Sequence, residues 1–410
     1  MRIHKAWIVA SVTFLVLIAA AAFRSTTSVL YMPIEMEFGW DRVTTSGAVS
    51  LNILIYGLTA PFAAVLMNRF GLKKVALAAL ALIALGTALT TVMTKPWELY
   101  VEWGILVGVG TGCLALAGGA QVASSWFVKH RGLVTGIFSA AYATGSLVFL
   151  PFIAQTANSV GWRQATLIVS VFCLAIIPIW WLVFQNAPKP PQTPLGGSID
   201  DVAAKPPVTV SANWLAMKQA IRKPAFWALA GTFFVCGWTT NGLIGAHFIP
   251  AAHDHGMPTN LAAGLLATVG IFDFIGTIAS GWLTDRFNSA YLLVAYYGLR
   301  GLALFTVPFV LGPDVQPPML FFVVFYGLDW IATVPPTVEL CRKHFGINNA
   351  SLVFGWVFAS HMVGAAIASS FAGWIRQYQG DYFIAWITAA VLCLAAAAYS
   401  LTLRKAPAKA

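Results

Sequence analysis

The stretch Gly281-Trp-Leu-Thr-Asp-Arg-Phe-Asn288 has a counterpart earlier in the chain, Ala64-Val-Leu-Met-Asn-Arg-Phe-Gly71. Each stretch ends one long apolar run and precedes the next, so both copies hold the same place in the pattern. Further identities follow at nearly the same offset: Pro33 with Pro250, Gly47 with Gly264, Gly145 with Gly364, and Gly161 with Gly380. The chain therefore consists of two related halves.

The composition indicates which medium, water or lipid, surrounds the two halves. Hydrophobic residues make up 59% of the chain and charged residues only 9%, whereas a soluble domain carries roughly 25% charged residues. So few charges cannot cover a water-facing surface. The chain also has 16 Trp and 28 Phe, and aromatic rings are enriched at the two interfaces of a bilayer. Lipid is therefore the expected solvent for most of the surface.

Long apolar runs predict the membrane-spanning segments, because a membrane helix needs about 20 mostly apolar residues. The runs cover residues 7–31, 43–67, 75–93, 97–123, 133–157, 165–184, 224–250, 260–283, 290–311, 317–340, 350–375 and 382–403. A proline-rich, polar segment separates the sixth run from the seventh. We predict an all-α integral membrane protein with twelve transmembrane helices in two six-helix halves, residues 1–184 and 223–410, joined by a linker at 185–222.

Basic residues predict the orientation through the positive-inside rule. The loops opposite the termini carry only Arg42, Lys95, Arg163 and Arg376. Apart from Arg24 and Arg300, which interrupt apolar runs, all other Lys and Arg fall in segments on the side of the termini. Both termini and the linker are therefore expected to be cytoplasmic. The expected location is the plasma membrane, which is the inner membrane in a bacterium.

Several other functions lack support in the sequence. The net charge of +10 forms no basic stripe with interleaved aromatics, so no nucleic-acid partner is expected. The five cysteines lack metal-ligand spacing and are interpreted as buried, reduced thiols. His253, Asp254 and His255 are interpreted as a solvated loop rather than a metal site. No P-loop, zinc motif or nucleophile elbow is present. We therefore predict no enzyme activity, no metal and no cofactor.

Gly108, Gly110 and Gly112 form a G-x-G-x-G pattern within the fourth run. As a nucleotide-binding signal this pattern is weak. Small residues in membrane helices more often allow close helix packing, and we favour that interpretation here.

The two repeated stretches resemble the G-x-L-x-D-R-x-G-R-K signature of the major facilitator superfamily. The resemblance implies parallel six-helix repeats with a substrate site at their interface near mid-membrane. It also implies a gating role for Asn68, Arg69, Arg131, Asp285 and Arg286. Asp285 would form a latch with the start of the fifth helix, at Arg131. The alternative is that these residues only enforce orientation. The first copy departs from the signature, with Asn68 in place of the acid and Ala64 in place of the first glycine.

A narrower resemblance covers nearly the whole chain except the linker. The segments 38–42 (FGWDR), 68–71 (NRFG), 126–136 (WFVKHRGLVTG) and 354–361 resemble the monocarboxylate transporter and oxalate/formate antiporter branch. In that branch, an Asp on the eighth helix is followed four residues later by an Arg that binds the carboxylate. Here Asp273 matches the Asp, but Thr277 stands at the Arg position. His361 stands where the antiporters have a Lys. The resemblance implies a carboxylate substrate with a rewritten set of anion-binding residues.

Ionisable residues within the apolar runs mark the candidate site, because such residues are costly in lipid and normally face a cavity and a partner. Arg24 is predicted to bind a carboxylate, since its guanidinium suits bidentate pairing; snorkelling to the interface is the alternative. Asp273 is the candidate for proton coupling, because a lone buried carboxylate takes up a proton. A fixed ion pair with Arg24 or Arg300 is the alternative. His361 can assist by exchanging a proton near neutral pH, or can simply be a satisfied core histidine.

Further polar positions complete the predicted site. Asp329 is a second candidate for proton coupling. Arg300 is expected to form a structural pair instead. Positions that could line the site are Asn241, Tyr56, Tyr142, Gln121, Asn52 and His247.

These observations predict a secondary active transporter that works by alternating access. The expected substrate is a small organic anion, a monocarboxylate or a similar carboxylate, with proton symport as the coupling. One rival is a major facilitator efflux pump for drugs or other amphiphilic solutes; another is a membrane enzyme or a sensor. The expected partners are the solute, protons and lipid, and a monomer is expected.

The latch hypothesis predicts that Asp285→Asn changes the balance between the two accessible states of the transporter. An exposed ion pair contributes up to about 1 kcal/mol, so we expect transport rate and accessibility to change roughly two- to fivefold. Flux into proteoliposomes and thiol accessibility from each side measure these quantities. Asp314→Asn, in a loop on the opposite side, is the matched control. Unchanged rate and accessibility in Asp285→Asn would contradict the latch.

Overall fold

The computed structural model describes residues 4–114, 116–130, 133–135, 137–138, 141, 145–188, 192–198, 209–346 and 349–404. The described residues are mostly helical and contain no strand; the only strand-like pairing among them is an isolated bridge between Phe127 and Leu195. The predicted all-α class is therefore confirmed.

The first half contains helices α1 (Lys5–Phe38), α2 (Arg42–Phe70), α3 (Leu72–Thr90), α8 (Gly145–Val160) and α9 (Trp162–Val183). Its fourth span is divided into α4 (Pro96–Leu99), the π-helix η1 (Tyr100–Val107), α5 (Gly108–Leu114) and α6 (Leu116–Trp126). The linker contains one helix, α10 (Val210–Ala220).

The second half repeats this plan. Its seventh span is divided into α11 (Pro224–Gly237), the π-helix η3 (Trp238–Ile244) and α12 (Gly245–Asp254). The remaining elements are α13 (Thr259–Thr284), α14 (Ser289–Val310), α15 (Pro317–Asp329), α16 (Val334–Phe345), α17 (Ala350–Gln379), α18 (Phe383–Ser400) and the 3-10 turn η4 (Leu401–Arg404).

Within the described residues, nine helices are long and apolar enough to cross a membrane by themselves, with α15 and α16 taken together as one. The other predicted spans are the fourth and seventh, which are divided by π-helices, and the fifth, which includes residues outside the described part. The architecture thus agrees with the prediction of twelve spans. The domain limits at residues 184 and 222 stay a prediction.

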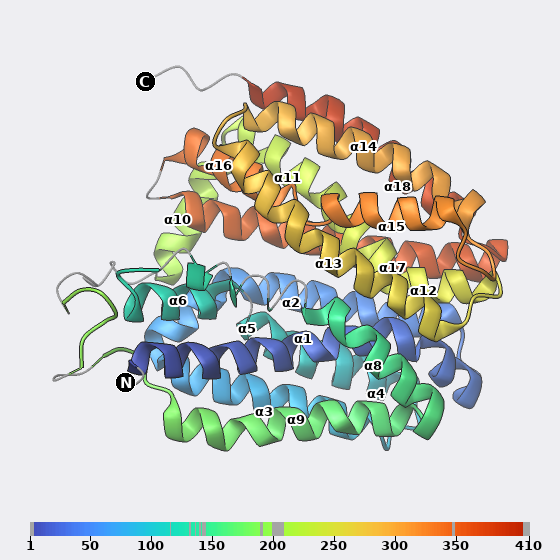
Figure 1. The fold of residues 1–410 in the computed structure, drawn as a ribbon, viewed down its shortest axis with the longest axis horizontal. Helices are drawn as coiled ribbons and strands as arrows, with labels where there is room; N and C mark the ends of the chain where they lie inside the picture. The colour runs from blue at the N-terminus through green and yellow to red at the C-terminus, as the bar shows by residue number, and fades with distance from the viewer. Residues whose placement is uncertain are drawn as a thin grey trace.

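The two halves lie side by side as two helical layers (Figure 1), with α1, α2, α3 and α9 in one and α13, α14, α17 and α18 in the other. The start of α1, the linker helix α10 and the last described turn, η4, lie at one end of the molecule, which we call the linker end. The opposite end, where α1 ends at Phe38 and α18 begins at Phe383, we call the far end. The helices run between these two ends.

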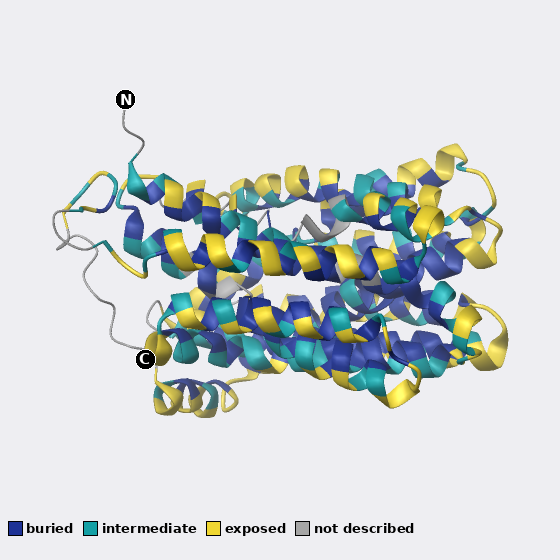
Figure 2. Cartoon of the chain, turned by 90° about the horizontal axis from the view of Figure 1, so that it is seen from below, coloured by how far each residue is buried: buried dark blue, intermediate teal, exposed yellow. Residues whose placement is uncertain are grey.

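The outer surface is apolar, as a lipid-facing surface must be. Buried residues face the inside of each layer and exposed residues face outward along the helices (Figure 2). Many exposed side chains are large and hydrophobic, including Leu182, Phe309 and Phe321. An apolar surface of this extent is not found on soluble monomers. The five cysteines, by contrast, are buried and form no disulfide, as predicted.

Glycines allow the helices to approach each other closely. A side chain on Gly110 would meet the backbone of α3, and one on Gly112 would meet the backbone of α2. The fourth span is therefore wedged between the second and third spans, which confirms the packing interpretation of the G-x-G-x-G pattern. In the second half, a Cβ atom on Gly276 of α13 would collide with the carbonyl oxygen of Leu328 on α15.

The close contact at Gly276 predicts that adding a single methyl group there lowers the stability of the protein. Gly276→Ala forces α13 and α15 apart, because a backbone atom cannot rotate away as a side chain can. We expect a loss of stability of about 1–3 kcal/mol, typical of overpacking, measured as a lower thermal midpoint in detergent. Gly298→Ala in α14 is the matched control, since no atom lies within 4 Å of its Cβ position. An equal effect of both substitutions would contradict this account.

Candidate functional site

The tenth span is interrupted in its middle. Helix α15 ends at Asp329, and α16 begins at Val334 with Pro335 and Pro336 in its first turn. Proline has no N–H group, so two carbonyl groups of the preceding turn lose their usual helical partner. Non-helical backbone at membrane depth is tolerated only where it is buried in protein or lines a cavity. The turn Trp330–Thr333 must therefore find hydrogen-bond partners in neighbouring helices.

Side chains of α13 supply two of these partners. The Asp273 carboxylate accepts a hydrogen bond from the backbone N–H of Ile331 at 3.1 Å. The same oxygen accepts one from the Thr277 hydroxyl at 3.1 Å. One turn further along, the Ser280 hydroxyl donates to the carbonyl of Ala332 at 2.5 Å. Asp273, which is buried, therefore contacts the interruption directly.

Arg300 on α14 holds the other side of the interruption. Its Nε donates to the Asp329 carboxylate at 2.5 Å, and its Nη2 donates to the carbonyls of Asp329 and Trp330 at 2.5 and 3.2 Å. Its Nη1 donates to Cys236 and Thr239 of the seventh span. Arg300 is fully buried. It thus pairs with Asp329 rather than Asp273, and forms the structural pair that was expected of it.

A second polar cluster lies where α2, η3 and α17 meet. The Asn241 amide nitrogen on η3 and the His361 Nε2 on α17 are 3.0 Å apart. Because an amide nitrogen only donates, this His361 nitrogen accepts. The His361 ring stacks on Phe358 and lies 4.6 Å from the ring of Phe233, measured between centroids. The cluster is therefore polar at one atom pair and aromatic around it.

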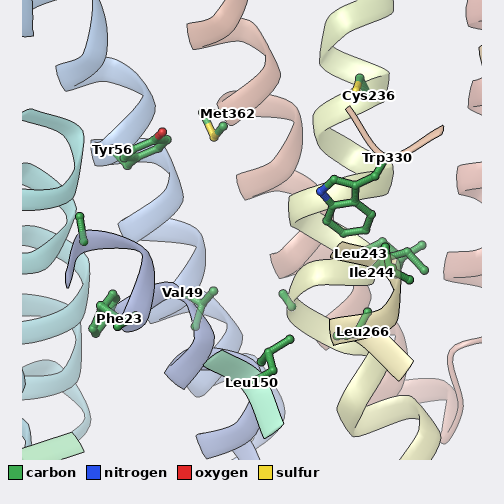
Figure 3. Packing of buried hydrophobic residues seen from close by; sticks show 14 of the residues in the cluster. Phe23, Val49, Tyr56, Leu150, Cys236, Leu243, Ile244, Leu266, Trp330 and Met362 are labelled. Carbon is green, nitrogen blue, oxygen red and sulfur yellow. The ribbon is translucent and has the colours of Figure 1, made fainter. Parts of the chain in front are cut away.

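Tyr56 on α2 completes the cluster from the first half. Its ring meets Phe358 edge-on at 6.0 Å between centroids. Next to it, a Cβ atom on Gly57 would collide with Met362 of α17. Figure 3 shows Tyr56 and Met362 pointing toward each other from the two helices. Of the predicted lining residues, the structure thus brings Tyr56, Asn241 and His361 together.

Among the other predicted lining residues, the structure describes the side chains of Gln121 and Asn52. Gln121 lies half-buried on α6. Tyr142 lies outside the described residues. Arg24 lies on α1, but its side chain is outside the described part. Asn52 donates to the carbonyl of Trp103 at 2.6 Å within the first half.

The predicted gating residues lie at the linker end. Asn68, Arg69, Asp285 and Arg286 are exposed at the ends of α2 and α13. The Arg286 guanidinium lies over the ring of Trp282, and that of Arg69 lies over Phe70. Arg131, the proposed partner of Asp285, lies outside the described residues, so the latch stays a prediction.

Direct hydrogen bonds between the halves gather at the far end, within the residues that the structure describes. Ser370 of α17 donates to Ser50 of α2 at 2.8 Å. Asn260 of α13 bonds to Gln155 and Asn158 of α8 at 2.9 and 2.7 Å. The structure is therefore closed at the far end.

Arg42 strengthens this closure and was missed as a functional residue. Sequence analysis placed Arg42 in a loop; it is instead the buried first residue of α2. It donates to Tyr382 of the second half at 2.6 Å, and its backbone N–H donates to Gln377 at 3.3 Å. His247, taken as a lining position, also lies here and contacts Tyr382. The FGWDR segment was the available signal, but its pairing with residues of the other half cannot be read from one sequence.

At the linker end, α10 connects the halves indirectly. The Asn213 amide donates to the carbonyl of Pro61 on α2 at 2.9 Å, and its oxygen accepts from the Trp356 indole on α17 at 3.1 Å. The rings of Phe62 and Trp214 pack around Trp356. The segment 253–255 was predicted to be a loop, but His253 and Asp254 end helix α12 and only His255 follows it. Asp254 pairs with Arg376 at 2.5 Å.

Comparisons with known proteins agree with this geometry. A family model described as Major Facilitator Superfamily matches residues 12–357. An uncharacterized MFS-type transporter, YcxA of Bacillus subtilis, is 25% identical, over 90% of this chain and 87% of its own. Monocarboxylate transporter 12-B of Danio rerio is 23% identical, over 92% of this chain and 82% of its own. Monocarboxylate transporter 13 of Rattus norvegicus is 24% identical, over 92% and 83% respectively.

Solved structures show the same fold. The xylose transporter XylE from E. coli, in a partially occluded inward open conformation, superposes with a TM-score of 0.70 over 99% of both chains, at 13% identity. The fucose:proton symporter FucP of E. coli gives a TM-score of 0.62 at 16% identity, over 98% of this chain and 100% of its own.

The contacts of Arg300 with Asp329 and Trp330 in the tenth span predict the effect of replacing Arg300. Arg300→Met leaves the Asp329 carboxylate buried without its cation and removes the guanidinium donor from the carbonyls of Asp329 and Trp330. Breaking a buried ion pair costs about 3–5 kcal/mol, so we expect a large fall in the thermal midpoint. The double variant Arg300→Met with Asp329→Leu removes the orphaned charge and should recover part of the loss. A double variant no more stable than Arg300→Met would contradict the pairing.

Proposed function

The chain belongs to the Major Facilitator Superfamily, and from this premise we propose that it carries a small organic anion, a monocarboxylate or similar carboxylate, across the membrane together with a proton. Family and fold are those of transporters, not of enzymes. The FGWDR, NRFG and WF-x-x-x-RGL segments and the monocarboxylate transporters among the relatives support the substrate class. The polar lining in the apolar interior supports a solute site.

The observation that carries this proposal is the interrupted tenth span with Asp273 bound to it. Interrupted helices at mid-membrane provide backbone groups for substrates and coupling ions in many transporters. Here the Asp273 carboxylate lies 3.1 Å from the Ile331 N–H in that interruption. A carboxylate so placed can gain or lose a proton while remaining in contact with the moving backbone.

Each candidate residue has a role that follows from its chemistry. The Arg24 guanidinium would bind the substrate carboxylate by paired hydrogen bonds. Asp273 would carry the proton: the Ile331 N–H stabilises its charged form, so protonation weakens that bond and loosens the tenth span. His361 would assist either ligand next to Asn241, with Tyr56 lining the site. Gln121 and Tyr142 complete the proposed lining, and Asp329 is a secondary proton site already engaged by Arg300.

The orientation is also part of the proposal. The basic residues assign the linker end, with both termini, to the cytoplasm, as in a bacterial inner membrane. The far-end hydrogen bonds then correspond to a state closed to the outside. Alternating access would require these bonds to break while the linker end closes. A single copy of the chain would suffice for this cycle.

A second candidate function is efflux of amphiphilic solutes. The rings of Phe233, Phe354, Phe358 and Tyr56 around His361 favour it, because aromatic rings bind apolar solutes without strict geometry. Resistance to such solutes that does not depend on Arg24 would support this function over carboxylate uptake.

Flux measurements test the proposed roles of Arg24 and Asp273. In proteoliposomes with an imposed pH gradient, Arg24→Ala should reduce carboxylate uptake by about ten- to a hundredfold, because hydrogen bonds to a charged group contribute about 1.5–3 kcal/mol. Asp273→Asn keeps the side-chain shape but cannot release a proton. It should lose gradient-driven uptake and retain exchange of labelled for unlabelled substrate.

Lys95→Ala, which removes an exposed basic residue outside the helices, is the control for lost charge. Proton-driven carboxylate uptake at the parent rate in both Arg24→Ala and Asp273→Asn would overturn this mechanism.

A further inference from the structure

The far end contains a hydrogen-bonded cluster that crosses between the halves, formed by Glu35, Arg42, Tyr382 and His247, which we call the far-end lock. Arg42 donates to both carboxylate oxygens of Glu35 at 2.7 and 2.8 Å, and to the Tyr382 hydroxyl at 2.6 Å. Thr45 donates to Glu35 at 2.5 Å. Glu35 and Arg42 belong to the first half, and Tyr382 and His247 to the second.

His247 on α12 is completely buried within this lock. Its Nε2 lies 2.9 Å from the carbonyl oxygen of Ser369, and its Nδ1 lies 3.2 Å from the Tyr382 hydroxyl. Its ring also meets the ring of Tyr31 on α1, at 5.4 Å between centroids. The imidazole therefore contacts both halves of the protein.

The partners determine where the hydrogens are. A carbonyl oxygen only accepts, so Nε2 of His247 carries a hydrogen. Arg42 only donates, so the Tyr382 oxygen accepts from it. The hydrogen of the Tyr382 hydroxyl then points to Nδ1 of His247, which must be unprotonated to accept it. The complete set of these hydrogen bonds therefore forms only while the imidazole is neutral.

A proton on Nδ1 disrupts this arrangement in two ways. The Tyr382 hydroxyl loses its acceptor and faces N–H donors from both Arg42 and His247. A second positive charge also arises beside Arg42, and like charges in a buried site repel strongly. The acids nearby cannot offset it, because Glu35 pairs with Arg42 and Asp254 pairs with Arg376.

No other charged side chain faces His247 from the elements packed against α12, among the described residues. The α13 segment at 259–270 contains no charged residue. The titratable and charged groups around the imidazole are Tyr31 and Glu35 on α1, Arg42 on α2, Asp254 on α12, Arg376 on α17, and Tyr382 before α18.

We propose that His247 is a proton-binding site, separate from Asp273, whose protonation releases the far-end lock. The neutral imidazole keeps the far end closed, and the protonated imidazole favours its opening. The physiological role of this site rests on the proposed function. If the far end faces outside, an acidic exterior opens the carrier toward the side from which protons enter.

Distances between spin labels test the proposal without any substrate. Labels on Val160→Cys at the end of α8 and Tyr378→Cys at the end of α17 lie on exposed positions of the two halves, while the native cysteines are buried. Between about pH 8 and about pH 5.5, we expect the population with long distances to rise about tenfold, as for an equilibrium linked to one proton.

His247→Gln keeps a donor for Ser369, and His247→Asn keeps an acceptor for Tyr382, but neither titrates. In both, the population should change less than about twofold over the same pH range. Tyr382→Phe, a conservative change, should raise the open population already at about pH 8. This variant tests the far-end lock if the His247 variants do not fold. Size-exclusion profiles check folding.

A full pH response in His247→Gln or His247→Asn, or an unchanged open population in Tyr382→Phe, would overturn the lock. Failure of the proposed function is distinguishable from failure of this inference. A His247-dependent pH response in a protein that transports no carboxylate would leave the lock intact. Proton-coupled uptake with a pH response independent of His247 would reject only the lock.

Discussion

The structure depends on one constraint: in lipid, every backbone polar group must find a partner inside the protein. Uninterrupted helices meet this requirement by themselves, but the tenth span does not, because Pro335 and Pro336 remove two donors. Ser280 of the eighth helix donates to the Ala332 carbonyl that Pro336 cannot serve. In the same turn, Asp273 accepts from the Ile331 N–H, and Arg300 of the ninth helix donates to the carbonyls of Asp329 and Trp330. The buried charges of Asp273 and Arg300 are thus explained together: both bind backbone groups of a turn that is not helical.

The same constraint connects the interruption to function. A continuous helix offers no backbone group to a ligand, whereas a broken one does. Asp273 combines an ionisable carboxylate with a hydrogen bond to this non-helical backbone. Asn241, which pairs with His361 of α17, lies on a second irregular element, the π-helix η3. Two of the polar clusters in the interior thus include backbone that departs from regular α-helix geometry.

Much of the fold could be predicted from the sequence, because apolar runs and a repeated motif report directly on membrane spans and on the two halves. The gathering of Tyr56, Asn241 and His361 was also accessible, since polar residues in apolar runs stand out. The partners were not accessible. Arg42 reads as a loop residue, and its contacts with Glu35 and Tyr382 join residues far apart in the chain. The interruption before Pro335 and Pro336 was missed, because residues 317–340 were taken as one continuous span. Arg300 was expected to form a structural pair, but its partner Asp329 could not be identified from the sequence.

The geometry of Arg300 also limits how this protein can diverge. Its planar guanidinium contacts a carboxylate and two carbonyls at once. Lysine cannot reproduce these contacts, because its donors all lie on one nitrogen. A substitution of Arg300 is therefore expected to be tolerated only together with a substitution of Asp329. Among related sequences, substitutions at these two sites should therefore occur together.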